Sequence, residues 1–147
     1  TKVKFKNKDG NLFLSYHTLN TNVERANNYE YLKMQDFVKV QKEKLSIKEY
    51  LEMMKQYKFT ICLEGSGPDT HRNYESLLVG SVPIMRRTVI EDLFKFYKLP
   101  GIFVEDWQEI DDDFYFKILN KRYDFSHVDK FLNIENYYEF IRSGEWE

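Results

Sequence analysis

The sequence has one cysteine, three prolines and six glycines among 147 residues, and these scarcities exclude several classes of protein. Because Cys62 stands alone, the chain forms no internal disulfide and no cysteine-rich metal site. It also lacks an Asn-x-Ser/Thr signal, and both absences favour a reducing compartment. The longest uncharged apolar stretch, residues 76–85, is interrupted by Gly80 and Pro83. It is shorter than the roughly 20 residues that cross a bilayer, so we expect a cytoplasmic protein that can still associate with a membrane.

Neither sign of charge is in large excess, since the net charge is −2. Residues 1–58 carry 12 basic and 7 acidic side chains, and residues 59–147 carry 10 and 17. This balance, without an arginine-rich tract, gives no electrostatic basis for a nucleic-acid partner. Near the start, lysines alternate with other residues, which predicts a solvated strand end with all four on one face. These lysines are Lys2, Lys4, Lys6 and Lys8.

The hydrophobic share of 42% and the aromatic share of 17% indicate a folded chain, whose length suits a single domain over residues 1–147. Short apolar runs alternate with helical patterns, which is typical of a parallel α/β sheet. We expect a doubly wound, Rossmann-like fold of about five strands, with C-terminal helices from about residue 107 to 147. The expected strands are residues 12–16, 37–40, 59–63, 81–85 and 102–104. The expected helices are residues 21–33, 46–54, 71–79, 111–121, one from 126 and 135–142.

Capping signals support several of these helices. Thr21 with Glu24 and Ser46 with Glu49 have capping-box spacing. Gly80 fits the end of the helix expected over residues 71–79. Residues 111–113 contain an Asp-x-Asp spacing that could formally bind a metal, but their place at a helix start predicts capping instead.

The segment from 59 to 85 carries the most chemical information. A buried strand is followed by Glu-Gly-Ser-Gly-Pro-Asp-Thr and then by a helix. Ligands of open parallel sheets bind at the carboxyl ends of strands, and Gly65 and Gly67 allow close approach of the backbone. The following helix N-terminus suits phosphate. The loop matches neither a Walker A site nor a Gly-x-Gly-x-x-Gly fingerprint.

Two charged side chains follow this loop. Arg72 lies in the first turn of the helix, where its positive charge gains nothing from the positive end of the helix dipole. The presence of two positive groups at one place indicates an anion bound between them. Glu75, three residues later, can accept hydrogen bonds from the vicinal hydroxyls of a ribose. The spacing therefore indicates a nucleotide diphosphate. The alternative is a simple surface pair between Arg72 and Glu75, worth a few tenths of a kcal/mol.

Residues 57–84 resemble the donor-site signature of GT-B glycosyltransferases, and most closely that of exostosin-like (GT47-type) enzymes. Shared features are a Lys-Phe strand, a Gly-rich loop, an Asp-Thr-His-Arg run, an aromatic-Glu step and Gly-x-Val-Pro-Ile. Residues 104–110 resemble the Val-x-Asp-Trp-x-Glu-Ile segment of those enzymes. Tyr137-Tyr138 with Ile141 resembles a terminal aromatic helix, and residues 20–22 with Arg25 resemble the first strand-to-helix turn.

The resemblance implies the nucleotide-sugar-binding half of a glycosyltransferase. Transfer of the sugar would be inverting and independent of metal, with a UDP- or GDP-sugar as donor and no further cofactor. Arg72 would neutralise the diphosphate leaving group, assisted by His71 in catalysis, and Glu75 would hold the ribose. The expected donor-binding residues are Gly65, Ser66, Gly67, Asp69, Thr70, His71, Arg72, Glu75, Thr21 and Arg25.

The catalytic base for a glycan or protein acceptor is not evident. In this fold it usually comes from an N-terminal domain, so we expect an acceptor domain or a partner chain to supply it. His71 and His17 are the local candidates, although a phosphate or sugar contact suits His71 better. Three alternatives stay open. The chain could be a non-catalytic nucleotide-sugar-binding or interaction module, or an α1,3-fucosyltransferase-like domain using GDP-fucose. A response-regulator-like domain is the third, but it would need a lysine after a later strand, and this chain has none there. The abundance of Lys, Asn, Tyr, Phe and Ile suggests an AT-rich bacterial or large-virus genome.

Overall fold

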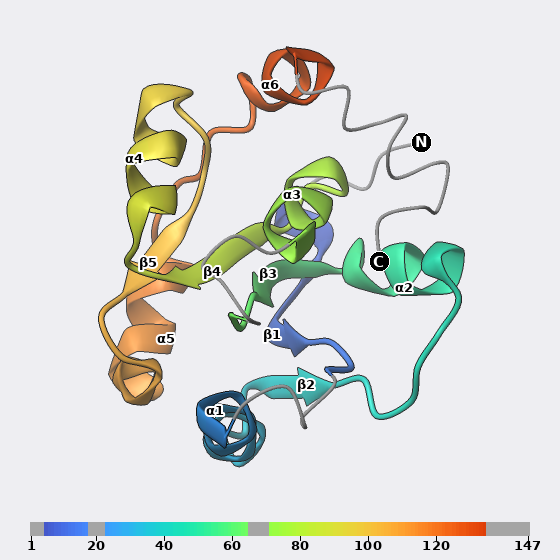
Figure 1. Cartoon of the computed structure of the whole chain (residues 1–147), viewed down its shortest axis with the longest axis vertical. Coiled ribbons are helices and arrows are strands. Elements are labelled where there is room, and N and C mark those ends of the chain that lie inside the picture. Colours follow the sequence, from blue (N-terminus) through green and yellow to red (C-terminus); the bar gives the residue numbers. More distant parts are fainter. Residues whose placement is uncertain (1–4, 18–22, 65–70, 135–147) are drawn as a thin grey trace.

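The fold is known from a computed structural model that describes residues 5–17, 23–64 and 71–134. Within them a five-stranded sheet has the order β2-β1-β3-β4-β5, with every neighbouring pair parallel (Figure 1). The prediction of a parallel α/β sheet is therefore confirmed. The strands are β1 Asp9–Leu14, β2 Val38–Val40, β3 Tyr57–Ile61, β4 Val82–Arg86 and β5 Ile102–Val104.

Helices cover both faces of the sheet, as a doubly wound fold requires. On one face, Leu32, Trp107 and Ile118 belong to one hydrophobic cluster with strand residues. On the other face, Leu77 and Phe94 belong to a second cluster that α6 completes. The helices are α1 Val23–Lys33, α2 Ile47–Met54, α3 His71–Leu78, α4 Val89–Phe96, α5 Asp112–Leu119 and α6 Val128–Ile134, with 3-10 turns η1 Phe5–Asn7 and η2 Trp107–Glu109.

The predicted caps of two helices are confirmed. The Ser46 hydroxyl accepts from the Glu49 N–H at 3.2 Å at the start of α2. Asp111 Oδ1 accepts from the Phe114 N–H at 2.9 Å at the start of α5, which confirms the capping interpretation of the aspartate run. The helix expected from residue 126 begins at 128. Thr21 and residues 135–142, which carried two further expectations, lie outside the described residues.

The helix α4 was not among the elements expected from the sequence. Thr88 caps this helix, since its hydroxyl accepts from the Ile90 N–H at 3.2 Å. The signal was present, because Thr88 and Glu91 have capping-box spacing, and Ile90 and Phe94 lie one helical turn apart on the buried face.

The lysine alternation near the start was interpreted wrongly. Residues 5–7 form a 3-10 turn rather than a strand, so alternation does not set one face. Lys8 is buried rather than solvated, and its Nζ donates to the Val79 carbonyl oxygen at 2.7 Å. Burial, followed by the nearby charge of Lys55, lowers the pKa of Lys8 to about 8. Lys2, Lys4 and the Lys6 side chain lie outside the described structure.

Gly80 ends α3 as predicted. Its φ of +77° is the left-handed conformation that glycine adopts without steric cost. The Gly80 N–H donates to the Leu77 carbonyl at 3.2 Å, and the Ser81 N–H donates to the Ser76 carbonyl at 2.9 Å. These two bonds form a Schellman motif and fix the direction in which the chain enters β4.

Candidate functional site

The strand order identifies where a ligand site is expected. The chain runs from β1 outward to β2 on one side and from β3 through β4 to β5 on the other, so the order reverses between β1 and β3. In doubly wound sheets, ligands bind at this switch point, beyond the carboxyl ends of the strands. Residues 15–17 follow β1 there, and α3 begins at His71 close by.

Arg72 connects the two sides of the switch point. It lies in the first turn of α3, as predicted, and is half-buried. Its Nε donates to Ser15 Oγ at 3.2 Å and its Nη2 donates to the Tyr16 carbonyl oxygen at 3.3 Å. The guanidinium therefore sits at the end of β1, 57 residues away in sequence.

Arg25 brings a second guanidinium to the same place from the first turn of α1. It is 7% exposed. Burial and then the charge of Arg72 lower the pKa of Arg25 from 12.5 to about 10. Desolvation and a nearby like charge both disfavour the charged form of a basic side chain. The structure thus gathers two of the predicted donor-binding residues into one strongly positive cluster.

Glu75 is fully buried, so it does not form a surface pair with Arg72. Its Oε1 lies 3.0 Å from His71 Nδ1 and accepts a hydrogen bond from the Tyr50 hydroxyl of α2, also at 3.0 Å. Glu75 Oε2 has no hydrogen-bond partner among the described residues. Burial raises the pKa of Glu75, while His71, Tyr50 and Arg72 act in the opposite direction.

His17 completes the cluster on the β1 side. It is 4% exposed, and its Nδ1 lies 2.6 Å from the Ser15 carbonyl oxygen. Burial and then the charge of Arg72 hold the pKa of His17 well below its usual range, with smaller contributions from Arg25 and His71. The hydrogen bond to Ser15 raises it in part.

Of the predicted site residues, the structure brings together His71, Arg72, Glu75 and Arg25. Three residues of the cluster were missed: Ser15, Tyr16 and Tyr50. A polar triplet directly after a buried strand was the available signal for residues 15–17, whereas nothing local marks Tyr50. Six predicted residues lie outside the described structure, namely Thr21, Gly65, Ser66, Gly67, Asp69 and Thr70.

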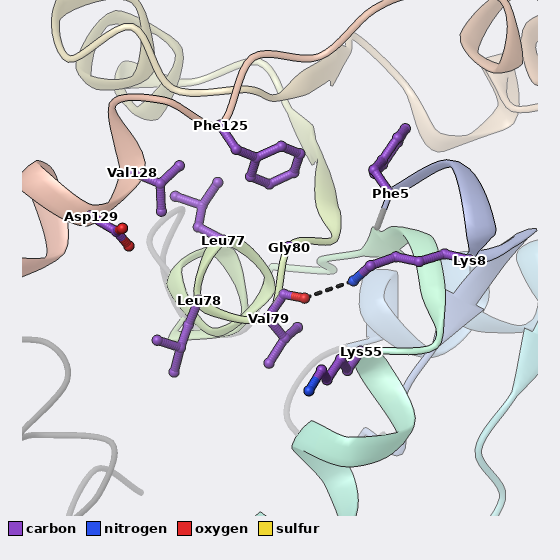
Figure 2. Close-up of a pocket in the computed structure, with 10 residues that line it drawn as sticks. All are labelled: Phe5, Lys8, Lys55, Leu77, Leu78, Val79, Gly80, Phe125, Val128 and Asp129. Carbon is purple, nitrogen blue, oxygen red and sulfur yellow. Dashed lines mark hydrogen bonds between the residues drawn. The ribbon is translucent and has the colours of Figure 1, made fainter. Parts of the chain in front are cut away.

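A separate pocket of about 360 Å³ lies at the opposite end of the strands from the basic cluster (Figure 2). Lys8 precedes β1, Lys55 precedes β3 and Gly80 precedes β4, so the pocket lies at the amino ends of these strands. Figure 2 shows Lys8 directed at the Val79 carbonyl and apolar side chains such as Phe125 around the hollow.

No three His, Cys, Asp or Glu side chains within residues 5–17, 23–64 and 71–134 are grouped to hold a metal ion. No helix in the same ranges is long and apolar enough to cross a membrane.

The fold and the cluster define a doubly wound α/β domain with a basic site at its switch point. A family model described as the RXYLT1 C-terminal domain matches residues 14–142, which include every described residue of the cluster. The chain belongs to this family, whose name denotes a xylosyltransferase, and it is a glycosyltransferase-related domain. No curated protein matches the chain. The narrower exostosin-like assignment stays a prediction.

Proposed function

We propose that the chain is the donor-binding half of a glycosyltransferase and holds the diphosphate of a nucleotide sugar at the switch point. The observation that carries this proposal is the convergence of Arg72 and Arg25, whose like charges lie close enough to lower the pKa of Arg25. A bound diphosphate would offset this repulsion. The N-terminus of α3 adds the positive end of its dipole at the same place.

In this proposal Arg72 acts on the leaving group. Transfer of the sugar breaks the bond between its anomeric carbon and the diphosphate oxygen, and negative charge develops on that oxygen. A guanidinium held in position by Ser15 and Tyr16 stabilises this charge without rearrangement at the moment of reaction. In this proposal the hydrogen bonds to the two residues that follow β1 supply the preorganisation that catalysis requires.

His71 and Glu75 have linked roles. The Glu75 carboxylate accepts a hydrogen bond from His71 Nδ1, which fixes the imidazole in the form that carries a proton on Nδ1. We propose that Glu75 and Tyr50 position His71 for a contact with phosphate or sugar. The ribose contact predicted for Glu75 stays a prediction, and Oε2 is the oxygen available for it. The acceptor, a glycan or a protein, and its general base would come with an N-terminal domain or a partner chain.

Calorimetric titration of the chain with UDP-xylose tests the proposal directly. UDP-xylose is chosen because the family name denotes a xylosyltransferase. We expect Arg72→Ala to weaken binding about 10- to 100-fold, the value of one charged hydrogen bond. Arg122→Ala is the matched control, since Arg122 is exposed and lies after α5. Equal affinity of wild type and Arg72→Ala, with both folded by circular dichroism, would show that Arg72 does not bind phosphate.

Parallel titrations separate the alternatives. Preference for GDP-fucose over UDP-xylose would favour the fucosyltransferase-like assignment. Tight binding of a nucleotide sugar without release of nucleotide diphosphate, even when acceptors are supplied, would favour a non-catalytic binding module.

A further inference from the structure

The two ring nitrogens of His17 differ, since Nδ1 makes a hydrogen bond and Nε2 makes none with the described residues. Nδ1 lies 2.6 Å from the Ser15 carbonyl oxygen, and a carbonyl can only accept a hydrogen bond, so Nδ1 carries a proton. In the neutral ring, Nε2 then presents a lone pair. Nε2 is buried, and none of the described residues offers it a hydrogen bond. A buried polar atom without a hydrogen-bond partner is costly, so this nitrogen indicates a contact with a ligand.

Three basic residues lie close enough to His17 to affect its pKa. Arg72 and His71 approach from α3 and Arg25 approaches from α1, and the charges of all three lower the pKa of His17. Tyr29 of α1 places its ring 6.1 Å from the imidazole, centroid to centroid. With burial added to these charges, the imidazole is neutral in the free protein at neutral pH.

We propose that His17 is a phosphate-binding residue that takes up one proton as a nucleotide sugar binds, and that its Nε2–H then donates to a phosphate oxygen. This inference rests on the proposed function, since it requires the diphosphate to bind beside Arg72. The proton comes from solvent and is held on Nε2, and no other bond forms or breaks. A bare lone pair would repel a phosphate oxygen, whereas a protonated Nε2 makes a charge-assisted hydrogen bond with it.

The same cluster explains why uptake accompanies binding. Arg72, Arg25 and His71 disfavour a positive charge on His17 while no ligand anion is bound. A diphosphate cancels their repulsion and adds an opposite charge next to Nε2, so the pKa of His17 rises on binding. Because the complex then holds one more proton than the free components, affinity falls as the pH rises from the free pKa to the bound pKa, by up to about tenfold per pH unit.

The test is calorimetric titration with UDP-xylose, whose phosphates do not titrate near neutral pH. Binding enthalpies at one pH are compared in two buffers that have different ionisation enthalpies. We expect wild type to take up a substantial fraction of one proton, and to bind more weakly as the pH rises. His127→Asn, which changes a histidine at the start of α6, should leave proton uptake and affinity unchanged.

Two substitutions at His17 separate binding from structure. His17→Asn can keep the hydrogen bond to the Ser15 carbonyl but has nothing at the Nε2 position, so it should bind about tenfold more weakly and take up no proton. His17→Gln can place an amide donor near the Nε2 position, so it should restore most of the affinity while binding becomes independent of proton uptake.

The outcomes are distinguishable. Binding of UDP-xylose without proton uptake, or with uptake that persists in His17→Gln, would overturn the role of His17 and leave the proposed function intact. Equal effects of the two substitutions on affinity would indicate a structural role and would also overturn it. No binding of UDP-xylose would overturn the UDP-sugar form of the proposed function and this inference with it.

Discussion

Glu75 shows how a single buried carboxyl group can affect both the site and the stability of the fold. Its Oε1 is held by His71 and Tyr50, and no part of the residue is exposed. Burial raises its pKa above the usual value near 4.5. Between the usual and the raised pKa, the folded protein holds a proton that the unfolded chain has released. The contribution of Glu75 to the free energy of unfolding is therefore highest below the usual pKa and falls as the pH rises through the raised one.

Replacement of Glu75 by glutamine should remove this pH dependence. The amide oxygen of Glu75→Gln can still accept from Tyr50 and His71, but the side chain no longer titrates. Relative to wild type, the variant should gain stability as the pH rises from about 4.5 to neutrality. Urea unfolding at a series of pH values measures the effect, with Glu52→Gln on the exposed face of α2 as control. Stability profiles of wild type and Glu75→Gln that stay parallel would refute the assignment.

At the scale of the element, α3 depends on its two ends for different reasons. Its first turn carries His71 and Arg72 into the site. Its last turn closes with the Schellman motif at Gly80, and the carbonyl of Val79 there accepts from Lys8. Because α3 has only eight residues, loss of the hydrogen bonds at either end would affect a large part of the helix.

Substitution of Gly80 should therefore reduce stability in proportion to the cost of a left-handed backbone. Gly80→Ala keeps space for its Cβ, since the nearest atom is Lys8 Nζ at 3.4 Å, but it forces a positive φ on an L-residue. We expect a loss of about 1 to 2 kcal/mol in the free energy of unfolding. Gly80→Asn should lose less, because asparagine tolerates this conformation better. Equal losses in urea unfolding would mean that packing, rather than φ, explains the glycine.

Elements whose signals are local were predictable from the sequence, and contacts between distant elements were not. Ser46 and Asp111 allowed their helices to be predicted, because a helix cap is a hydrogen bond between residues only three positions apart. Thr88 carried the same kind of signal for α4 and was overlooked. By contrast, the contact between Arg72 and Ser15 depends on which strands are neighbours, and no local pattern encodes the order of strands.

The same division applies to Lys8, whose alternation with Phe5 and other residues suggested a strand face. Alternation sets a face only where the backbone is extended, and the 3-10 turn at residues 5–7 removes that condition. The partner that buries Lys8, the Val79 carbonyl, lies 71 residues away. The environment of Lys8 therefore depends on a contact between distant parts of the chain, which a local alternation of residues does not encode.

At the scale of the whole molecule, the sheet separates two places where a ligand could bind. The basic cluster lies at the carboxyl ends of β1 and β3, and the pocket between Lys8 and Lys55 lies at the amino ends of the same strands. α3 spans the distance between them, with His71 at one end and Leu78 at the other. The two ends of this helix therefore report which place a nucleotide sugar occupies.

Hydrogen–deuterium exchange with and without UDP-xylose can locate the ligand on this frame. We expect exchange to slow at residues 14–17, in the first turn of α1 and in the first turn of α3, because the diphosphate would bridge these segments through Arg25 and Arg72. Residues 5–9, 54–58 and 78–82, which surround the pocket, should exchange at an unchanged rate. The Arg72→Ala chain serves as control, since it should lose the protection at every segment together. Protection confined to the segments around Lys8 and Gly80 would instead assign the nucleotide to the pocket, because local stabilisation by a ligand follows the contacts that it makes.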